Sequence, residues 1–262
     1  MYYEHISKTG TIISHKNGFG NNESAITSSH VHDTFEIVYM LKGDVDFTVE
    51  HKTRHLEPGD FVVIAPGKYH HVKANPDVDF DHFLFAFHEN KIFKELCDTL
   101  YEKDPFYTNC QHIGLLTMYF DECYEKFDGV VLDTLFKGEL LKIIAMLCYT
   151  ANHTPEVGTA LVSQAINYID RHLQENIYLE DIAKHCNVTK LVLSDEFKAK
   201  VGITIMHYVA AKKALATKQA IMNGMKKGEA ATKFGYSNYS TFYRGYQKLK
   251  VLDLEELIKK TM

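Results

Sequence analysis

Features that would indicate secretion, membrane insertion or covalent catalysis are scarce in this 262-residue sequence. The five cysteines are odd in number and form no Cys-x-x-Cys pair, so we expect reduced thiols that mostly pack in the core. The first residues carry no basic-then-apolar signal, and the longest apolar run, Ile143 to Tyr149, is far too short to span a membrane. Outside one histidine cluster, no nucleophile–base pair stands out. We therefore expect a cytoplasmic protein that is not an enzyme.

Charge is distributed unevenly along the chain. Residues 158–262 hold 16 Lys and Arg against 10 Asp and Glu, whereas the first 157 residues hold 13 against 24. The net charge of −5 therefore hides a basic C-terminal part, as binding to nucleic acid would require. A solvated, lysine-rich helical surface would give the same balance, so charge alone leaves both interpretations open.

Two segments of the basic part, Leu179–Lys198 and Lys226–Lys248, share one pattern. Each predicts a short helix, a tight turn and a second helix, which together make a helix-turn-helix. Further residues fit this prediction in matched pairs. They are Ala183 and Ala231 at the close helix approach, Asn187 and Gly235 at the left-handed turns, Thr189 and Ser237 as helix caps, and Phe197 and Tyr246 as aromatic anchors.

These two motifs, joined by an expected helix from about Ile205 to Met222, resemble the DNA-binding domain of AraC/XylS-type transcription regulators. The resemblance covers roughly the last hundred residues. The residues that carry it are Phe197-Lys198, Gly202, Tyr208, Glu229-Ala230-Ala231, Phe234-Gly235-Tyr236-Ser237 and Phe242-Tyr243-Arg244. It implies a sequence-specific regulator that binds double-stranded DNA through two recognition helices.

The recognition helices are expected at about Lys190–Lys200 and Asn238–Lys248. The residues expected to contact DNA are Lys190, Leu191, Ser194, Asp195 and Lys198 in the first motif, and Ser237, Asn238, Tyr239, Ser240, Tyr243, Arg244 and Lys248 in the second. Arg244 is the best single candidate, because a guanidinium can pair with guanine through two hydrogen bonds. The sequence departs from the family pattern at several positions that bear on specificity. Asp195 is repelled by phosphate unless it reads a cytosine amino group. Val251 and Leu254 replace the usual Gly and Pro of the final turn.

The first 87 residues predict a small β-barrel or jelly roll. Phe35–Leu41, Val45–Glu50, Phe61–Ala65 and Asp81–Phe87 are apolar or alternate with period two, and Gly and Pro turns separate them. From Glu89 to Ala151 the apolar period becomes helical, with helices at about Ile92–Tyr101, Ile113–Phe127 and Leu132–Thr150.

One constellation of polar side chains stands out in the expected barrel. His30 and His32 would share a strand face, and Glu36 has the same parity. This segment with Gly43 resembles the first cupin motif, and Gly59 to His70 resembles the second, although Ala65 replaces its usual Pro. His30, His32, Glu36 and His70 form a candidate site for a divalent metal, and with Tyr69 a candidate site for a small-molecule effector. Alternatively, these groups hydrogen-bond a ligand, or each other, without metal.

We therefore expect an α+β multidomain chain: a cupin-like barrel over residues 1–88, a helical packing region over 89–151, a linker over 152–158 and an all-α DNA-binding domain over 159–262. The resemblance implies a homodimer that uses the helical region, and RNA polymerase is a further candidate partner. Two other functions stay open. One is a metal-dependent cupin enzyme with a helical appendage, and the other is an interaction protein whose helix-turn-helix units no longer read DNA.

Overall fold

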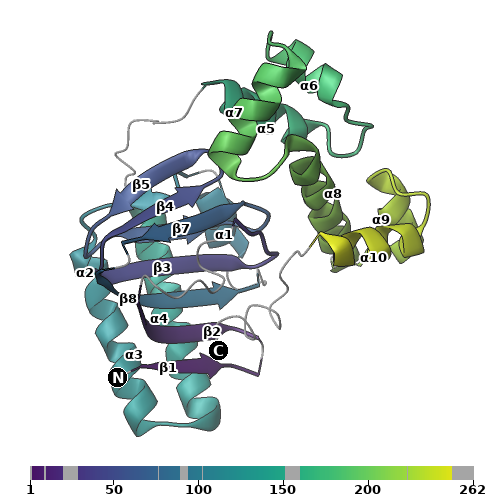
Figure 1. Cartoon of the computed structure of the whole chain (residues 1–262). Helices are drawn as coiled ribbons and strands as arrows, with labels where there is room; N and C mark the ends of the chain where they lie inside the picture. Colours follow the sequence, from purple (N-terminus) through teal and green to yellow (C-terminus); the bar gives the residue numbers. More distant parts are fainter. Residues whose placement is uncertain are drawn as a thin grey trace.

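In the computed structural model, the described residues are 2–8, 10–19, 29–75, 77–88, 94–101, 103–150, 160–222 and 224–249. They form an N-terminal half, residues 2–150, built on β-sheets, and a C-terminal half, residues 160–249, built of helices (Figure 1). The expected linker at 152–158 lies outside the described residues. In the part of the chain that is described, no helix is both long and apolar enough to cross a membrane.

Two antiparallel sheets form the frame of the N-terminal half. One has the order β1-β2-β8-β3-β6-β9 and the other the order β5-β4-β7. The strands are β1 (Tyr3–Ile6), β2 (Ile12–Phe19), β3 (Phe35–Lys42), β4 (Val45–Val49), β5 (Lys52–Leu56), β6 (Phe61–Ile64), β7 (His70–Ala74), β8 (Asp79–Phe87) and β9 (Phe106–Tyr107). The four strands expected from the sequence thus appear as β3, β4, β6 and β8, with ends shifted by at most two residues.

Strand β3 shows why the sequence here is a continuous apolar run. Val38 and Met40 pack between the two sheets, in a core shared with Phe47 and Val72. Ile37 and Tyr39 point to the opposite face, where helices cover the larger sheet. A strand buried on both faces has no polar side to alternate with. The space between the sheets is where the polar cluster described below lies.

Helices cover the outer face of the six-stranded sheet (Figure 1). They are α1 (Lys94–Tyr101), α2 (Gln111–Gly114), the 3-10 turn η1 (Leu115–Thr117), α3 (Met118–Lys126) and α4 (Gly129–Tyr149). The single helix expected at Ile113–Phe127 is thus divided into α2 and α3, with the 3-10 turn η1 between them. Gly114 lies there against the Tyr39 hydroxyl, where any side chain would collide with the ring.

The C-terminal half contains both expected helix-turn-helix units. Its helices are α5 (Ala160–Arg171), α6 (Leu179–His185), α7 (Lys190–Val201), α8 (Ile205–Met222), α9 (Lys227–Lys233) and α10 (Tyr239–Lys248). We call α6 with α7 the first unit and α9 with α10 the second unit; α8 joins them (Figure 1). The turns are left-handed as expected, with φ of 55° at Asn187 and 88° at Gly235.

One expected helix cap is confirmed and one is wrong. The Thr189 hydroxyl accepts from the Val192 N–H at 3.3 Å and so begins α7. Helix α10 is capped by Asn238, whose side-chain oxygen accepts from the Thr241 N–H at 2.9 Å. Ser237 instead lies one residue before the cap, and its hydroxyl meets that of Thr241. Both residue types can cap a helix, so the choice depends on where the helix begins.

The two halves are packed against each other. Val31 and Tyr69 of the N-terminal half belong to the same buried cluster as Phe197 and Tyr208 of the C-terminal half. The Tyr208 hydroxyl donates to Glu50 at 2.6 Å. The buried Asp33 forms an ion pair of 2.6 Å with Lys218. Apolar packing and charged hydrogen bonds therefore fix the C-terminal half to one end of the barrel.

Candidate functional site

Three histidines and one glutamate meet inside the barrel. The nearest imidazole nitrogens of His30, His32 and His70 all lie within 4.8 Å of one another. His30 comes close to His70 because the two residues form an isolated antiparallel bridge. Glu36 completes the group, with its carboxylate oxygens 3.2 Å from Nε2 of His32 and 3.8 Å from Nε2 of His70. The structure thus brings together the four residues expected to hold a metal.

Backbone carbonyls determine which imidazole nitrogens face the centre of this cluster. Nδ1 of His32 lies 3.0 Å from the Thr34 carbonyl oxygen, and Nδ1 of His70 lies 3.1 Å from that of Lys68. A carbonyl oxygen only accepts, so each Nδ1 carries the proton. In the neutral ring Nε2 then holds a lone pair. Both Nε2 atoms are buried, and their near polar neighbour is the Glu36 carboxylate.

The charge states of the cluster follow from burial and proximity. Burial favours a neutral Glu36, but the His32 hydrogen bond and the neighbouring imidazoles outweigh it and lower the pKa of Glu36 to about 2. Burial, assisted by His30, holds the pKa of His70 well below its ordinary value. At neutral pH the cluster therefore pairs a carboxylate with a neutral imidazole. A cation placed between the carboxylate and the imidazole nitrogens would stabilise this arrangement.

The donor set fits a divalent transition metal. Imidazole nitrogens and a carboxylate oxygen suit Zn, Fe, Ni and Mn, with bonds of about 2.0–2.2 Å. Two ligands on opposite sides of such an ion lie about 4 Å apart, so the cluster needs only small side-chain movements to close on one. The backbone carbonyls that accept from Nδ1 of His32 and of His70 would also hold the two imidazoles in the orientation that points Nε2 at an ion.

Two residues lie elsewhere than the sequence analysis expects or were not considered there, Tyr69 and His82. Tyr69, expected beside the histidines, points to the other side of its strand: its ring lies 5.5 Å from that of Tyr208, in the contact between the halves. His82, which sequence reasoning missed, is buried on β8 and stacked on Phe80, a residue of the core between the sheets. The period-two alternation of β8 could have identified it, because residue 82 has the parity of the inner face.

The expected DNA-contacting residues lie on accessible faces of α7 and α10. Leu191 is 71% exposed and Tyr243 is 46% exposed, although both are large apolar or aromatic residues on helices whose other face is core. Lys190, Asp195 and Lys198 are also exposed on α7, as are Ser240, Arg244 and Lys248 on α10; Ser237 and Asn238 are exposed just before α10. Ser194 and Tyr239 are half-buried. Leu193, Phe197 and Phe242 face inward.

Known proteins are similar to this chain in both halves. Residues 20–129 match the AraC-like ligand binding domain. The probable transcriptional regulator LumQ of Photobacterium leiognathi is 21% identical over 231 residues, which cover 84% of this chain and 87% of LumQ. The transcriptional regulatory protein HptR of Staphylococcus aureus is 30% identical over 87 residues, covering 33% of this chain and 34% of HptR. A crystal structure of apo ToxT K231A from Vibrio cholerae aligns over 93% of this chain and 95% of its own, with 13% identity and a TM-score of 0.41.

A ligand-binding barrel joined to two helix-turn-helix units defines an effector-controlled transcriptional regulator. The family match and the relatives identify its class more closely. Residues 20–129 belong to the AraC-like ligand binding domain family, and the relatives that match the chain are named transcriptional regulators.

Proposed function

We propose that this regulator reads double-stranded DNA with α7 and α10 while its barrel binds the effector. The observation that carries the proposal is the pair of recognition helices, each with a buried apolar face and an exposed polar one. The uninterrupted helix α8 joins the two units. This arrangement suits two successive major grooves, with the exposed residues of α10 over base edges and the lysines near phosphates.

Arg244 provides the sharpest test of DNA reading. Replacing Arg244 with Ala should weaken specific binding by about 1–3 kcal/mol and relax the preference at one base pair. Fluorescence anisotropy against DNA upstream of the protein's own gene would measure it. Arg171→Ala is the matched control, because it removes the same charge from an exposed position on α5. Equal losses for the two variants, or wild-type binding no tighter than to random DNA, would contradict the proposal.

The barrel cluster is proposed to bind a divalent cation, either as the effector or as the group that holds it. His30, His32, His70 and Glu36 would be the ligands, because their donor atoms converge on one buried point inside the barrel. When bound, the metal would supply a positive centre for an anionic or oxygen-donor effector. We propose no enzymatic turnover, because an enzyme would leave the two helix-turn-helix units without a role.

Metal content can be measured directly. Protein purified without chelator or a His-tag should carry a transition metal by inductively coupled plasma mass spectrometry, or take one up from Mn, Fe, Ni or Zn salts. His70→Asn should lose it, whereas His55→Asn should not, since His55 lies on the exposed surface of β5. Wild type without stoichiometric metal after loading would leave the cluster as a metal-free hydrogen-bonding site.

The segment Ser29–Asp33 is proposed to connect the cluster to the DNA-binding half. Its even residues, His30 and His32, point into the cluster. Its odd residues point the other way: the Ser29 hydroxyl donates to the Val201 carbonyl at 3.0 Å, Val31 joins the core of the C-terminal half, and Asp33 pairs with Lys218. Binding at the histidines would therefore shift the surface on which the C-terminal half rests. Such a ligand favours one arrangement of the halves over another, which is linkage.

Val31→Ala tests this connection. The variant should bind metal like the wild type, but the metal should change its DNA affinity less. Val78→Ala is the control, because Val78 lies outside the contact between the halves. A Val31→Ala protein whose DNA response to metal equals that of wild type would exclude this route.

A homodimer is proposed as the working form in the cytoplasm. The inner face of α4 packs in the core of the N-terminal half and is not available to a second copy, since Leu140, Ile143 and Leu147 are fully buried. Large apolar side chains instead stay exposed around η1, α3 and the start of α4: Leu115, Met118, Phe127, Val130 and Val131. Sedimentation should give a dimer at tens of micromolar, and Val130→Glu should give a monomer. We propose RNA polymerase as a further partner on the family resemblance alone.

A further inference from the structure

The two recognition helices expose different chemistry. In the first turn of α7, the side chains of Leu191 and Val192 are 71% and 47% exposed. Asp195 is also exposed and lies on the same side of α7, because residues three and four positions apart are neighbours on a helix. The exposed face of α10 instead carries Arg244 and the Ser240 hydroxyl. The face that α7 turns to solvent is therefore apolar and acidic, whereas that of α10 is polar and basic.

The two units also differ in charge. Residues 179–201, the first unit, hold four Lys against four Asp and Glu, whereas residues 227–248, the second unit, hold four Lys and Arg against one Glu. Within the first unit, the ammonium of Lys190 donates to the carboxylate of Glu180. Attraction to phosphates depends on net positive charge and does not depend on sequence. It therefore belongs mainly to the second unit, and the first unit contributes through contacts with the bases.

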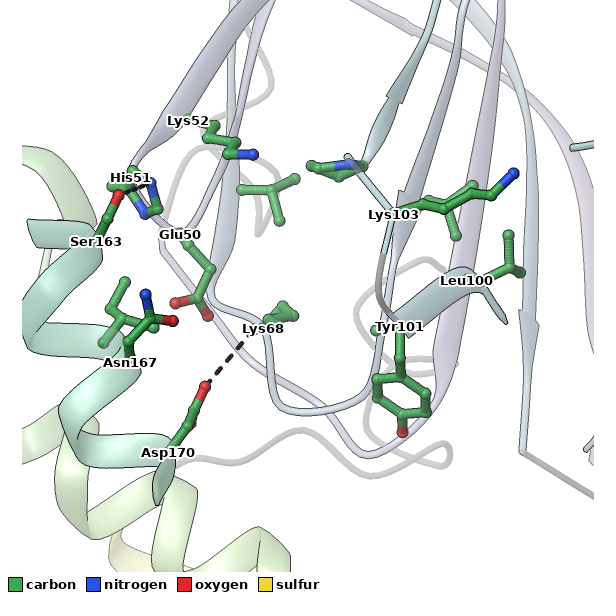
Figure 2. A pocket seen from close by; sticks show the side chains of 15 residues that line it. Glu50, His51, Lys52, Lys68, Leu100, Tyr101, Lys103, Ser163, Asn167 and Asp170 are labelled. Atoms are coloured by element: carbon green, nitrogen blue, oxygen red, sulfur yellow. Dashed lines mark hydrogen bonds and ion pairs between the residues drawn. The ribbon is translucent and has the colours of Figure 1, made fainter. Parts of the chain in front are cut away.

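Packing between the halves leaves the first turn of α7 accessible. Helix α5, which shares a buried cluster with the first unit, faces the N-terminal half across a cavity of about 220 Å³ (Figure 2). On that side Asp170 of α5 lies 3.9 Å from the ammonium of Lys68. The other end of α7 is held where the Ser29 hydroxyl donates to the Val201 carbonyl. Both contacts lie away from the first turn of α7, so a partner can reach it while the halves stay packed.

The exposed apolar surface at Leu191 and Val192 matches a base edge better than it matches a protein. Two side chains are far too few for a stable protein interface, which buries about 800 Å² on each partner. The first residues of a recognition helix are those that reach base edges in the major groove. The C5-methyl of thymine is the apolar group that the bases present there, and the cytosine amino group is a donor that Asp195 could accept from. The same face would mismatch guanine, which presents two acceptors.

We propose that the first unit reads thymine methyl groups through Leu191, with Val192 packed beside it, and adds little attraction to phosphates. This assignment rests on the proposed function, because it requires α7 to lie in a major groove. The second unit supplies the positive charge and the guanidinium of Arg244, while the first unit discriminates by apolar contact. The operator accordingly has one half-site in which thymine methyl groups determine the affinity.

Replacement of thymine by uracil tests methyl reading, because it removes only the 5-methyl group and keeps the base pairing and the charge of the duplex. Selection from random-sequence duplexes with the full chain provides the operator. The selected duplex is then made with uracil in one half-site at a time. Fluorescence anisotropy should show one half-site where uracil weakens binding by roughly threefold to fivefold per contacted methyl, the effect of exposing one buried carbon group. Unchanged affinity for uracil in both half-sites would overturn the proposal.

Truncation of Leu191 locates the contact. Leu191→Ala should bind the thymine and the uracil duplex with equal affinity, because the side chain that distinguishes them is gone. The variant should fold, since the position is exposed and Ala favours helix, and a circular dichroism melt establishes this. Met206→Ala is the matched control, because it truncates a side chain of α8 that is 41% exposed and lies outside both units. A Leu191→Ala protein that keeps the wild-type ratio of affinities would refute the assignment to Leu191.

Salt dependence tests the uneven charge of the two units. Lys248→Gln should lower the slope of log affinity against log salt by about one, the effect of losing one phosphate contact. Lys190→Gln should lower it less, because Glu180 already pairs with Lys190. Equal reductions would contradict the division of tasks. A wild-type chain that selects no operator would overturn the proposed function as well, whereas specific binding that is insensitive to uracil would overturn methyl reading alone.

Discussion

The two helix-turn-helix units have the same local design but different surroundings. The first unit shares its buried cluster with Val31 and Tyr69 of the N-terminal half. The second has a small core of Ala214, Ala231 and Phe242, completed by half-buried side chains of its own and of α8. Its described link to the N-terminal half is indirect: Lys218 pairs with Asp33 and also donates to the Tyr246 hydroxyl at 3.0 Å.

This difference shows how one half could control DNA binding by the other. The first unit is fixed to the barrel by packing, so its position follows that of Ser29–Asp33. The second unit is held mainly by α8 and is freer to adjust to the DNA. Two copies of one motif can therefore differ in local stability, because the surrounding contacts and not the motif determine how firmly each copy is held.

Truncation of the aromatic anchors should have the largest effect and distinguish the two cores. Phe197→Ala should cost about 3–5 kcal/mol, because the ring is fully buried in the shared cluster. It should also weaken protection from hydrogen exchange at Val31 and Tyr69. Phe242→Ala should raise exchange only in α9, α10 and the facing part of α8. Equal changes around Val31 in both variants would show that the two units are held alike.

Acid should weaken the N-terminal half, against which the first unit is packed. Burial, assisted by the Lys16 charge, lowers the pKa of His82 to about 4, below the 6.5 of an unfolded chain. Between these values the unfolded chain binds a proton that the folded one does not. Stability therefore falls as pH falls from about 6.5 toward 4, by about 3 kcal/mol in full. Urea unfolding at pH 7 and pH 5 should show a smaller loss for His82→Gln, and equal losses would contradict this assignment.

Removal of one tyrosine hydroxyl from each unit's contacts would compare how strongly the first and the second unit are held. Tyr208→Phe deletes a hydrogen bond to the buried Glu50 and should cost about 1.5–3 kcal/mol. Tyr246→Phe deletes a half-exposed contact with Lys218 and should cost less than about 1 kcal/mol. Denaturant midpoints measure both. A larger loss for Tyr246→Phe would reverse the order proposed for the two units.

The helix caps give the smallest expected effect. Thr189→Ala and Asn238→Ala should each cost about 1 kcal/mol, since each removes one side-chain acceptor at a helix start. Ser237→Ala should cost less, because its hydroxyl does not cap α10. Thermal melts of the three variants would test this. Equal losses of stability for Ser237→Ala and Asn238→Ala would contradict the assignment of the cap to Asn238 alone.

Local patterns predicted most of the fold. The left-handed positions at Asn187 and Gly235, the recognition helices and the four apolar strands follow from residue type and spacing. The histidine cluster was also predictable, because Glu36 keeps the parity of His30 and His32 although a bend interrupts the strand at residues 33–34. His82 escaped notice because a single histidine in an apolar strand has no partner within its own motif.

Contacts between the halves could not be predicted. Glu50 and Tyr208 are 158 positions apart, and nothing local to either residue indicates the other. Tyr69 shows the consequence, since its neighbour His70 was placed correctly while Tyr69 itself faces the C-terminal half. The cavity between the halves depends on the same long-range packing. Sequence periodicity gives the direction of a side chain from its strand, but not what lies on that side.

The alternation along Ser29–Asp33 also has an evolutionary consequence. In the proposed mechanism, recognition of the effector and transmission of its signal would be carried by neighbouring residues of one short backbone segment. A substitution that retunes the cluster for another effector will shift Val31 or Asp33 as well. We therefore expect relatives that adopt a new effector to change residues 201 and 218 together with residues 30 and 32. In this regulator, specificity and strength of response would evolve as one trait.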